Sequence, residues 1–230
     1  NGFLEKLYGV PGFQLGDVYA EYMKYAEELR DFVTDTSILL DKALKEGCHI
    51  LFEGAQGTHL DVDHGTYPFV TSSNATAGGA CTGTGVGPTK IDKVIGIVKA
   101  YTTRVGSGPF PTELEGETAE WFREKGKEFG ATTGRPRRCG WLDALVVRYA
   151  ARVNGLTGLV ITKLDILDGL PEVKICTGYR HQGKVFDEMP SELEILEQCE
   201  PIYETLEGWK KNTACLTSFE QLPPQAKRYV

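Results

Sequence analysis

Apolar side chains recur at spacings of three and four residues in several stretches of the chain, which predicts amphipathic helices. The clearest stretch is residues 142–154, where one face is apolar and Gly155 follows as a C-terminal cap. We expect helices over residues 18–29, 34–47, 118–127, 142–154 and 224–230.

Short apolar runs lie between these helices and predict buried strands. We expect strands over residues 49–52, 95–104 and 159–162, and a hairpin over residues 172–179 and 184–186 with its turn near residues 182–183. Helices that alternate with buried strands indicate an α/β fold with a central, mostly parallel sheet flanked by helices, plus a small β-hairpin subregion. We expect residues 1–230 to form one domain, with ligands at the strand ends.

Residues 53–88 form a long polar stretch that is poor in apolar side chains, and such a loop inside a compact domain is usually functional or disordered. Gln56 stands between two glycines, so its amide can offer a donor and an acceptor to a polar ligand. The hydroxyls of Thr71, Ser72 and Ser73 could bind phosphate oxygens.

The same stretch also permits a metal site, because four possible ligands fall in one short run: His59, Asp61, Asp63 and His64. In an extended segment the two aspartates would share a face, but the two histidines would point to opposite faces. The competing interpretation is that these side chains cap turns.

The segment GATTGRPRRCGWLD, residues 130–143, concentrates arginines beside two threonines and two flexible glycines. Gly130 and Gly134 allow the intervening amides to approach a ligand closely. Arg135, Arg137 and Arg138 offer planar forks that match carboxylate or phosphate oxygens. The pattern predicts an anion-binding loop, and the alternative is a solvated basic turn that precedes a helix.

The segment TKLD, residues 162–165, stands at the end of the strand predicted over residues 159–162. A carboxylate there can accept two hydrogen bonds from guanine, whereas adenine lacks that pair of donors. The alternative is an ordinary surface loop. The segment GTGVGPTK, residues 83–90, does not fit a phosphate-loop pattern, and we interpret it as a glycine turn before a helix that starts near Pro88.

Composition narrows the class of protein further. The formal net charge of −7 argues against a broad nucleic-acid surface, so the arginines are expected to serve a small anion. Six cysteines stand far apart without a CxxC pair, which is typical of reduced cytosolic thiols. The opening NGFLEKLYGV is unlike a signal peptide, and no apolar run is long enough to span a bilayer. We therefore expect a cytoplasmic protein without membrane partners.

Together, GATTGRPRRCGWLD, TKLD, FEGAQGTHLDVDHGTYPFVTSSN and KAYTTRVGSGPFPTEL closely resemble the adenylosuccinate synthetase family, in this order and over nearly the whole chain. The resemblance implies a P-loop-NTPase-like architecture and a GTP- and Mg²⁺-dependent ligase of AMP biosynthesis, a homodimer in its full-length form. GTP would phosphorylate the 6-oxygen of inosine monophosphate (IMP), and the amine of L-aspartate would then displace phosphate to give adenylosuccinate.

The resemblance also assigns residues to each substrate. Gln56 would assist catalysis near the 6-oxygen, and IMP would be bound by Gln56, Thr71, Val105 and Arg135. Aspartate would be held by the loop of Ala131, Thr132, Thr133, Gly134, Arg135, Pro136 and Arg137. GTP would be bound by Arg137, Lys163, Leu164 and Asp165.

Several parts of the family pattern have no counterpart in these 230 residues. They are the glycine-rich phosphate loop with its aspartate base and magnesium ligand, a histidine acid, an arginine from the partner subunit and a C-terminal guanine segment. We therefore expect a fragment with no metal ligands of its own and no activity alone. A short, non-catalytic guanine-nucleotide-binding module is the alternative.

Overall fold

The computed structural model describes residues 1–130 and 134–230, and the chain divides into two compact units. The first unit comprises residues 1–51 and 84–86. It contains α1 (Gly2–Tyr8), α2 (Leu15–Leu29), the 3₁₀ turn η1 (Arg30–Phe32) and α3 (Thr36–Lys45). The α3 helix begins where Asp35 accepts hydrogen bonds from the amides of Ser37 and Ile38, close to the predicted start at residue 34.

The second unit comprises residues 52–83 and 87–230 and contains the described strands. They are β1 (Ile95–Lys99), β2 (Thr102–Arg104), β3 (Arg138–Gly140), β4 (Leu142–Asp143), β5 (Gly158–Thr162), β6 (Glu172–His181), β7 (Lys184–Phe186) and β8 (Glu200–Glu207). Its helices are α5 (Gly116–Lys125), α6 (Ala144–Asn154), α7 (Leu193–Glu197) and α8 (Pro224–Tyr229), and α4 (Gly78–Thr84) ends at its boundary. Single 3₁₀ turns are η2 (Thr58–Leu60), η3 (Pro88–Lys90), η4 (Leu164–Leu167) and η5 (Phe219–Gln221).

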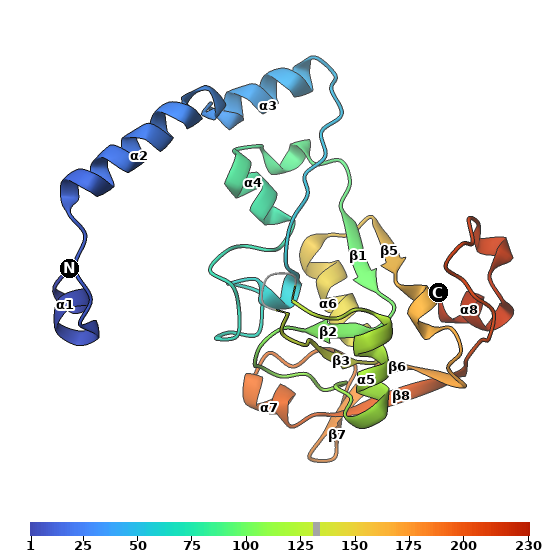
Figure 1. Cartoon of the computed structure of the whole chain (residues 1–230). Coiled ribbons are helices and arrows are strands. Elements are labelled where there is room, and N and C mark those ends of the chain that lie inside the picture. Colours follow the sequence, from blue (N-terminus) through green and yellow to red (C-terminus); the bar gives the residue numbers. More distant parts are fainter. Residues whose placement is uncertain (131–133) are drawn as a thin grey trace. The chain divides into compact units, whose positions relative to one another are not determined.

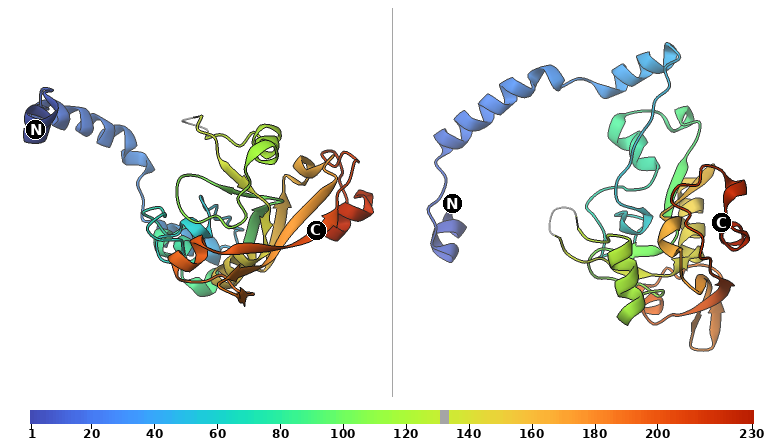
Figure 2. Two further views of the ribbon diagram at one scale, coloured as in Figure 1. Left: turned by 90° about the horizontal axis from the view of Figure 1, so that it is seen from below. Right: turned by 45° about the vertical axis from the view of Figure 1, so that its right-hand side comes forward.

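Three small sheets form the scaffold of this unit (Figure 1). Strands β1 and β5 pair in parallel, with Lys99 opposite Thr162 at their carboxyl ends. Strands β2 and β3 are antiparallel, and β6 pairs with β4, β7 and β8. The views in Figure 2 show β6 and β8 side by side, and the two strands run in opposite directions. The α/β class, the parallel pairing and the β6–β7 hairpin are as predicted.

The core of the second unit lies between the sheets and α5, α6 and α8. At its centre the ring of Phe122 stacks on Tyr101, with centroids 4.9 Å apart, and meets Trp141 edge to face, with centroids 5.3 Å apart. A second cluster joins Leu145 of α6 to Tyr179 of β6. Asp143 caps α6, Gly155 closes it with φ 61°, and the predicted apolar face points inward. No helix among the described residues is both long and apolar enough to cross a bilayer.

Four predictions about elements were wrong in detail. Residues 49–52 form no strand, because no described strand pairs with them, and Leu51 is 91% exposed. The single strand expected over residues 95–104 is two strands, β1 and β2, in different sheets. Strand β5 is present but not buried, since Leu159 and Val160 are each 45% exposed. The helix expected from Pro88 is only the single turn η3.

Candidate functional site

Three cationic side chains converge on one buried carboxylate where the parallel strands end. Glu128 follows α5 and is fully buried. Its oxygens accept hydrogen bonds from Lys99 Nζ at 2.8 and 2.9 Å, Lys163 Nζ at 2.6 Å and Arg137 Nη1 at 2.8 Å. The hydroxyl of Tyr101 donates a fourth contact at 2.6 Å. The carboxyl ends of β1 and β5 therefore share one charged cluster with the arginine-rich loop.

The environment keeps Glu128 ionised. Burial by itself raises the pKa of this carboxyl, but the hydrogen bonds from Lys163, Lys99, Tyr101 and Arg137 outweigh burial and lower the pKa to about 2. For Lys99 burial outweighs the hydrogen bond: burial lowers the pKa of the Lys99 amine, and the contact with Glu128, which raises it, compensates only in part. Glu128 thus remains ionised at neutral pH.

The arginine-rich loop is closed at its base by backbone hydrogen bonds. Arg137 N donates to the carbonyl of Glu128 at 2.9 Å, and Gly130 N donates to the carbonyl of Arg135 at 2.8 Å. Gly134 has φ 64°, a left-handed conformation that glycine adopts without steric cost. Ala131, Thr132 and Thr133, which sequence analysis assigns to aspartate, lie outside the described residues.

Arg138 has a different role from the one its sequence pattern indicates. Its guanidinium forms a bidentate ion pair with Glu113, in which Nε donates to Oε1 at 2.7 Å. Its Nη1 also donates to the carbonyls of Gly106 and Gly108, at 3.1 and 2.9 Å. The donors of Arg138 therefore hold two neighbouring segments together. Arg138 is thus a structural residue and not one of the anion-binding arginines.

A cavity of about 290 Å³ lies beside the turn that follows β5. It is lined by Lys125, Asp165, Asp168, Gly169, Lys210, Asn212 and Ala214. Asp168 joins the two sides of this region, because its carboxylate accepts from Trp209 Nε1 at 2.5 Å and from Thr213 N at 2.7 Å. The volume is near the lower end for small-molecule sites, about 300 Å³. Asp165, the last residue of the TKLD segment, thus lines a cavity.

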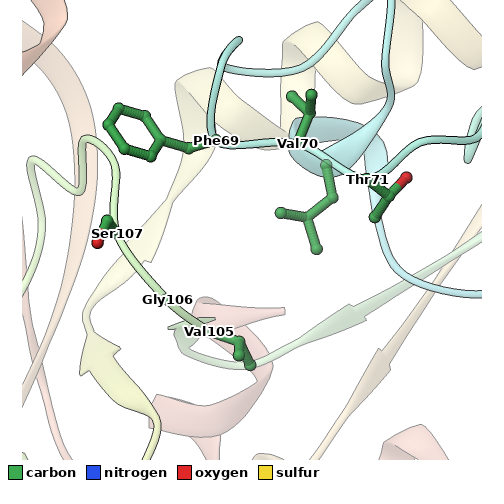
Figure 3. A pocket seen from close by; sticks show the side chains of 7 residues that line it. Phe69, Val70, Thr71, Val105, Gly106 and Ser107 are labelled. Carbon is green, nitrogen blue, oxygen red and sulfur yellow. The ribbon is translucent and has the colours of Figure 1, made fainter. Parts of the chain in front are cut away.

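A second cavity, of about 210 Å³, lies between the loop of residues 53–88 and the segment after β2. Figure 3 shows Phe69, Val70 and Thr71 on one side of it and residues 105–107 on the other. Thr71 and Val105, which are 34 positions apart in the sequence, are therefore neighbours at one hollow. Both are residues that sequence analysis assigns to IMP.

Arg104 holds the two walls of this cavity together. Its side chain is buried, and its Nη2 donates to Thr66 Oγ1 at 2.8 Å and to the carbonyl of Phe69 at 3.2 Å. Its Nε donates to the carbonyl of Ser107 at 3.0 Å. Gly108 leaves room for this guanidinium, since a Cβ there would lie 2.3 Å from Nη2. Sequence analysis missed Arg104, which looks like an ordinary charged residue at a strand end.

The loop of residues 53–88 is anchored by α6 and by Asp61. Asn154 Nδ2 donates to Thr58 Oγ1 at 2.9 Å, and its Oδ1 accepts from Ala77 N at 2.7 Å. The buried Asp61 accepts from the amides of Asp63, His64 and Thr76, each at 2.9 Å. Burial alone raises the pKa of Asp61, but these amides lower it to about 2.

Asp61 therefore caps a turn, as the competing interpretation of this run held. Among the residues that the structure describes, no group of three or more His, Cys, Asp or Glu side chains is placed to hold a metal. The metal-site alternative for residues 59–64 is thus not supported.

Gln56 and Lys163 share an unusual backbone conformation. Their φ angles are 66° and 59°, in the left-handed region, which costs a non-glycine residue about 1 kcal/mol or more. Such conformations cluster at functional sites. Gln56 is exposed and lines neither of the two cavities, whereas Lys163 is part of the Glu128 cluster.

Comparisons with known proteins agree with this arrangement. The model of the family described as adenylosuccinate synthetase matches residues 1–230. The chain belongs to the adenylosuccinate synthetase family. The adenylosuccinate synthetase of Carboxydothermus hydrogenoformans is 59% identical over 100% of this chain and 54% of its own length. That of Citrifermentans bemidjiense is 60% identical over 100% of this chain and 53% of its own length.

Solved structures give the same result. A fully ligated adenylosuccinate synthetase from Plasmodium falciparum superposes with a TM-score of 0.91 and 40% identity, over 98% of this chain and 54% of that one. The chain thus spans about half the length of the curated relatives it matches. The predicted family and the α/β fold are therefore confirmed.

Within this family fold, the structure brings together some of the expected site residues. Arg137 and Lys163 meet at Glu128, Thr71 and Val105 line one cavity, and Asp165 lines the other. Leu164 packs against the main core cluster, beneath the turn that carries Asp165. Sequence analysis missed Glu128 and Lys99, since each looks like a solvated charge beside a helix or strand end.

Proposed function

We propose that these residues form the substrate-holding part of an adenylosuccinate synthetase. The full enzyme would join IMP and L-aspartate with GTP and Mg²⁺, as a cytoplasmic homodimer in AMP biosynthesis. The observation that carries the proposal is the placement of Asp165 at a cavity, two residues from Lys163 and its cationic cluster. A carboxylate for the guanine base and cations for phosphate are thus supplied side by side.

The chemistry we propose proceeds in two steps. A base removes the proton from N1 of IMP, the 6-oxygen attacks the γ-phosphorus of GTP, and GDP leaves. The aspartate amine then attacks C6, the phosphate departs with the C–O bond electrons, and the amine loses its proton to give adenylosuccinate. In this scheme the described residues position the substrates. Their cations lie near the transferred phosphoryl group and the carboxylates of aspartate, and stabilise the negative charge that develops there.

Each substrate is assigned to residues of this chain. IMP is assigned to the cavity of Thr71 and Val105, with Gln56 and Arg135 contributing. Aspartate is assigned to residues 131–137, and GTP to Arg137 and residues 163–165. The Mg²⁺ ligands are assigned to other parts of the full enzyme, and we expect these 230 residues alone to be inactive.

The assignment of guanine to Asp165 is tested with Asp165→Asn in a full-length synthetase that contains these 230 residues. One acceptor then becomes a donor that faces the donors of guanine, so we expect the KM for GTP to rise roughly tenfold or more. The KM values for IMP and aspartate should stay within about twofold, because neither substrate would touch this side chain.

Asp187→Asn is the matched control, since Asp187 is exposed beyond β7 and lines neither cavity. An unchanged GTP KM in Asp165→Asn would contradict the guanine assignment. GTP binding by a full-length wild-type protein that forms no adenylosuccinate would favour the alternative of a non-catalytic guanine-nucleotide-binding module.

A further inference from the structure

Glu128 is a buried ionised side chain to which the proposed chemistry gives no role. It contacts neither of the two cavities directly, yet it accepts hydrogen bonds from four residues of three segments: Lys99, Tyr101, Arg137 and Lys163. A buried charge is costly unless it is well paired. The local fold is organised to place this carboxylate.

A tight turn after α5 directs the side chain of Glu128 into the core. Gly126 has no space for a side chain, since a Cβ there would lie 2.2 Å from the hydroxyl of Tyr101. Lys127 adopts a left-handed conformation with φ 50°. Glu128 N then donates to the carbonyl of Arg123 at 2.8 Å, while the carbonyl of Glu128 accepts from Arg137 N at 2.9 Å. Backbone and side chain of Glu128 thus both close the loop of residues 128–137.

The charges of the cluster are unequal. Three cations share the single carboxylate of Glu128, so the group carries an excess of positive charge. The side chains of Lys99, Arg137 and Lys163 are 26%, 30% and 34% exposed, whereas that of Glu128 is 0% exposed. The carboxylate therefore fixes cations that still face solvent, which is how a preorganised anion site is built.

Glu128 also connects two substrate sites. Arg137 belongs to the loop assigned to aspartate, whereas Lys163 belongs to the turn assigned to guanine. Lys163 Nζ additionally donates to the carbonyl of Gly126 at 2.7 Å, which ties the guanine turn to the base of that loop. A displacement of the aspartate loop would thereby be transmitted to the guanine turn, and the reverse.

We propose that Glu128 is a positioning residue that holds the aspartate loop and the guanine turn in one geometry and so couples the use of aspartate to the use of GTP. This inference rests on the proposed function. It predicts that loss of the carboxylate impairs the use of GTP and of aspartate together, and the use of IMP less.

The test uses Glu128→Gln in a full-length synthetase that contains these 230 residues. The substitution keeps the size of the side chain but leaves three cations unneutralised. We expect the KM values for both GTP and aspartate to rise roughly tenfold or more, as for loss of a charge-assisted hydrogen bond. The KM for IMP should rise less than these two values, because Arg104 holds the IMP cavity and Arg135 is the one residue of this loop assigned to IMP.

Glu113→Gln is the matched control. Glu113 is the carboxylate that pairs with Arg138, and it lines neither cavity. The Glu113→Gln substitution should leave the KM values for GTP and aspartate unchanged. If Glu128→Gln does not fold, Glu128→Asp, which retracts the same charge by one methylene, should raise both values in the same direction by a smaller factor.

A second measurement does not depend on activity. Amide hydrogen exchange of Gly130 and Arg137, the donors at the base of the loop, should accelerate at least tenfold in the Glu128 variant, while the β6–β8 amides stay protected. Unchanged exchange together with unchanged KM values would overturn the proposal. An inactive wild-type protein with accelerated loop exchange in the variant would instead refute the proposed function and leave the positioning role standing.

Discussion

His59 is a histidine that its surroundings hold in the neutral form. Its Nε2 is buried and has no hydrogen-bond partner among the described residues, and its ring packs edge-on against Tyr149 with centroids 6.1 Å apart. Burial, helped by the charge of Arg104, lowers the pKa of His59 to about 4. The unfolded chain would titrate near pH 6.5, so protonation favours unfolding below that pH.

This difference predicts a pH-dependent stability. As pH falls from 6.5 toward 4, His59 becomes protonated in the unfolded chain but stays neutral in the folded protein, so the free energy of unfolding decreases. Between pH 7 and pH 5 the loss is about 2 kcal/mol for this one group. His59→Phe keeps a ring for Tyr149 and should abolish that part of the decrease, measured by urea unfolding at both pH values.

His64→Asn is the control for the His59 variant, since His64 is an exposed histidine of the same loop. It should retain the full decrease between pH 7 and pH 5. Equal pH dependence in the wild type and His59→Phe would show that His59 is not held neutral.

The pairing of β2 with β3 depends on close backbone contact at Gly140. Thr102 lies opposite Gly140 in the sheet, and on the other edge Trp141 N donates to the carbonyl of Thr112 at 3.2 Å. A Cβ at Gly140 would lie 2.3 Å from that carbonyl oxygen. Gly140 ends β3, the strand that begins at Arg138 of the arginine-rich segment. This contact therefore also fixes where the arginine-rich loop returns to the sheet.

Gly140→Ala should therefore destabilise the second unit, because β3 must move away from a rigid backbone segment. We expect a loss of about 1–3 kcal/mol in the free energy of unfolding, the usual cost of overpacking. Gly87→Ala is the matched control, since Gly87 has φ −64° and open space around its Cα. Equal urea midpoints for the two variants would contradict the close approach.

At the scale of the whole molecule, stability is concentrated in the second unit. Its two clusters of buried apolar residues draw their members from residues 100–229. The described helices α1, α2 and α3 contain no buried residue. In contrast, the short α8 contributes Ala226 and Tyr229 to the main cluster, and the Tyr229 hydroxyl donates to the carbonyl of Ala100 at 2.6 Å.

Deletion of residues 1–51 should consequently cost little, despite removing 51 residues. We expect Tm to fall by less than about 4 °C, the shift that corresponds to about 1 kcal/mol in a protein of this size. Deletion of residues 224–230 removes far fewer residues but should lower Tm more, since it opens the main core. Differential scanning calorimetry compares the two, and the reverse order would contradict this distribution of stability.

Prediction from sequence succeeded where the information is local. The apolar face of α6, its glycine cap and the β6–β7 turn are encoded within a few residues, and the structure confirms them. It failed for residues 49–52 and for the exposure of β5, because strand pairing and burial depend on segments distant in the sequence. Strand β8 was missed for the same reason, since its alternation is weak and its partner β6 defines it.

By itself, the sequence determined the family, the α/β class and the chemical type of each motif, because spacing and side-chain chemistry are local properties. Only the tertiary structure decided which charges serve a ligand and which serve the fold. Arg137 and Arg138 are adjacent and chemically identical, yet one faces Glu128 in the cationic cluster and the other is bound by Glu113. That division arises because successive residues of β3 and its flank point to opposite sides, where different partners lie: the buried Glu128 and the exposed Glu113.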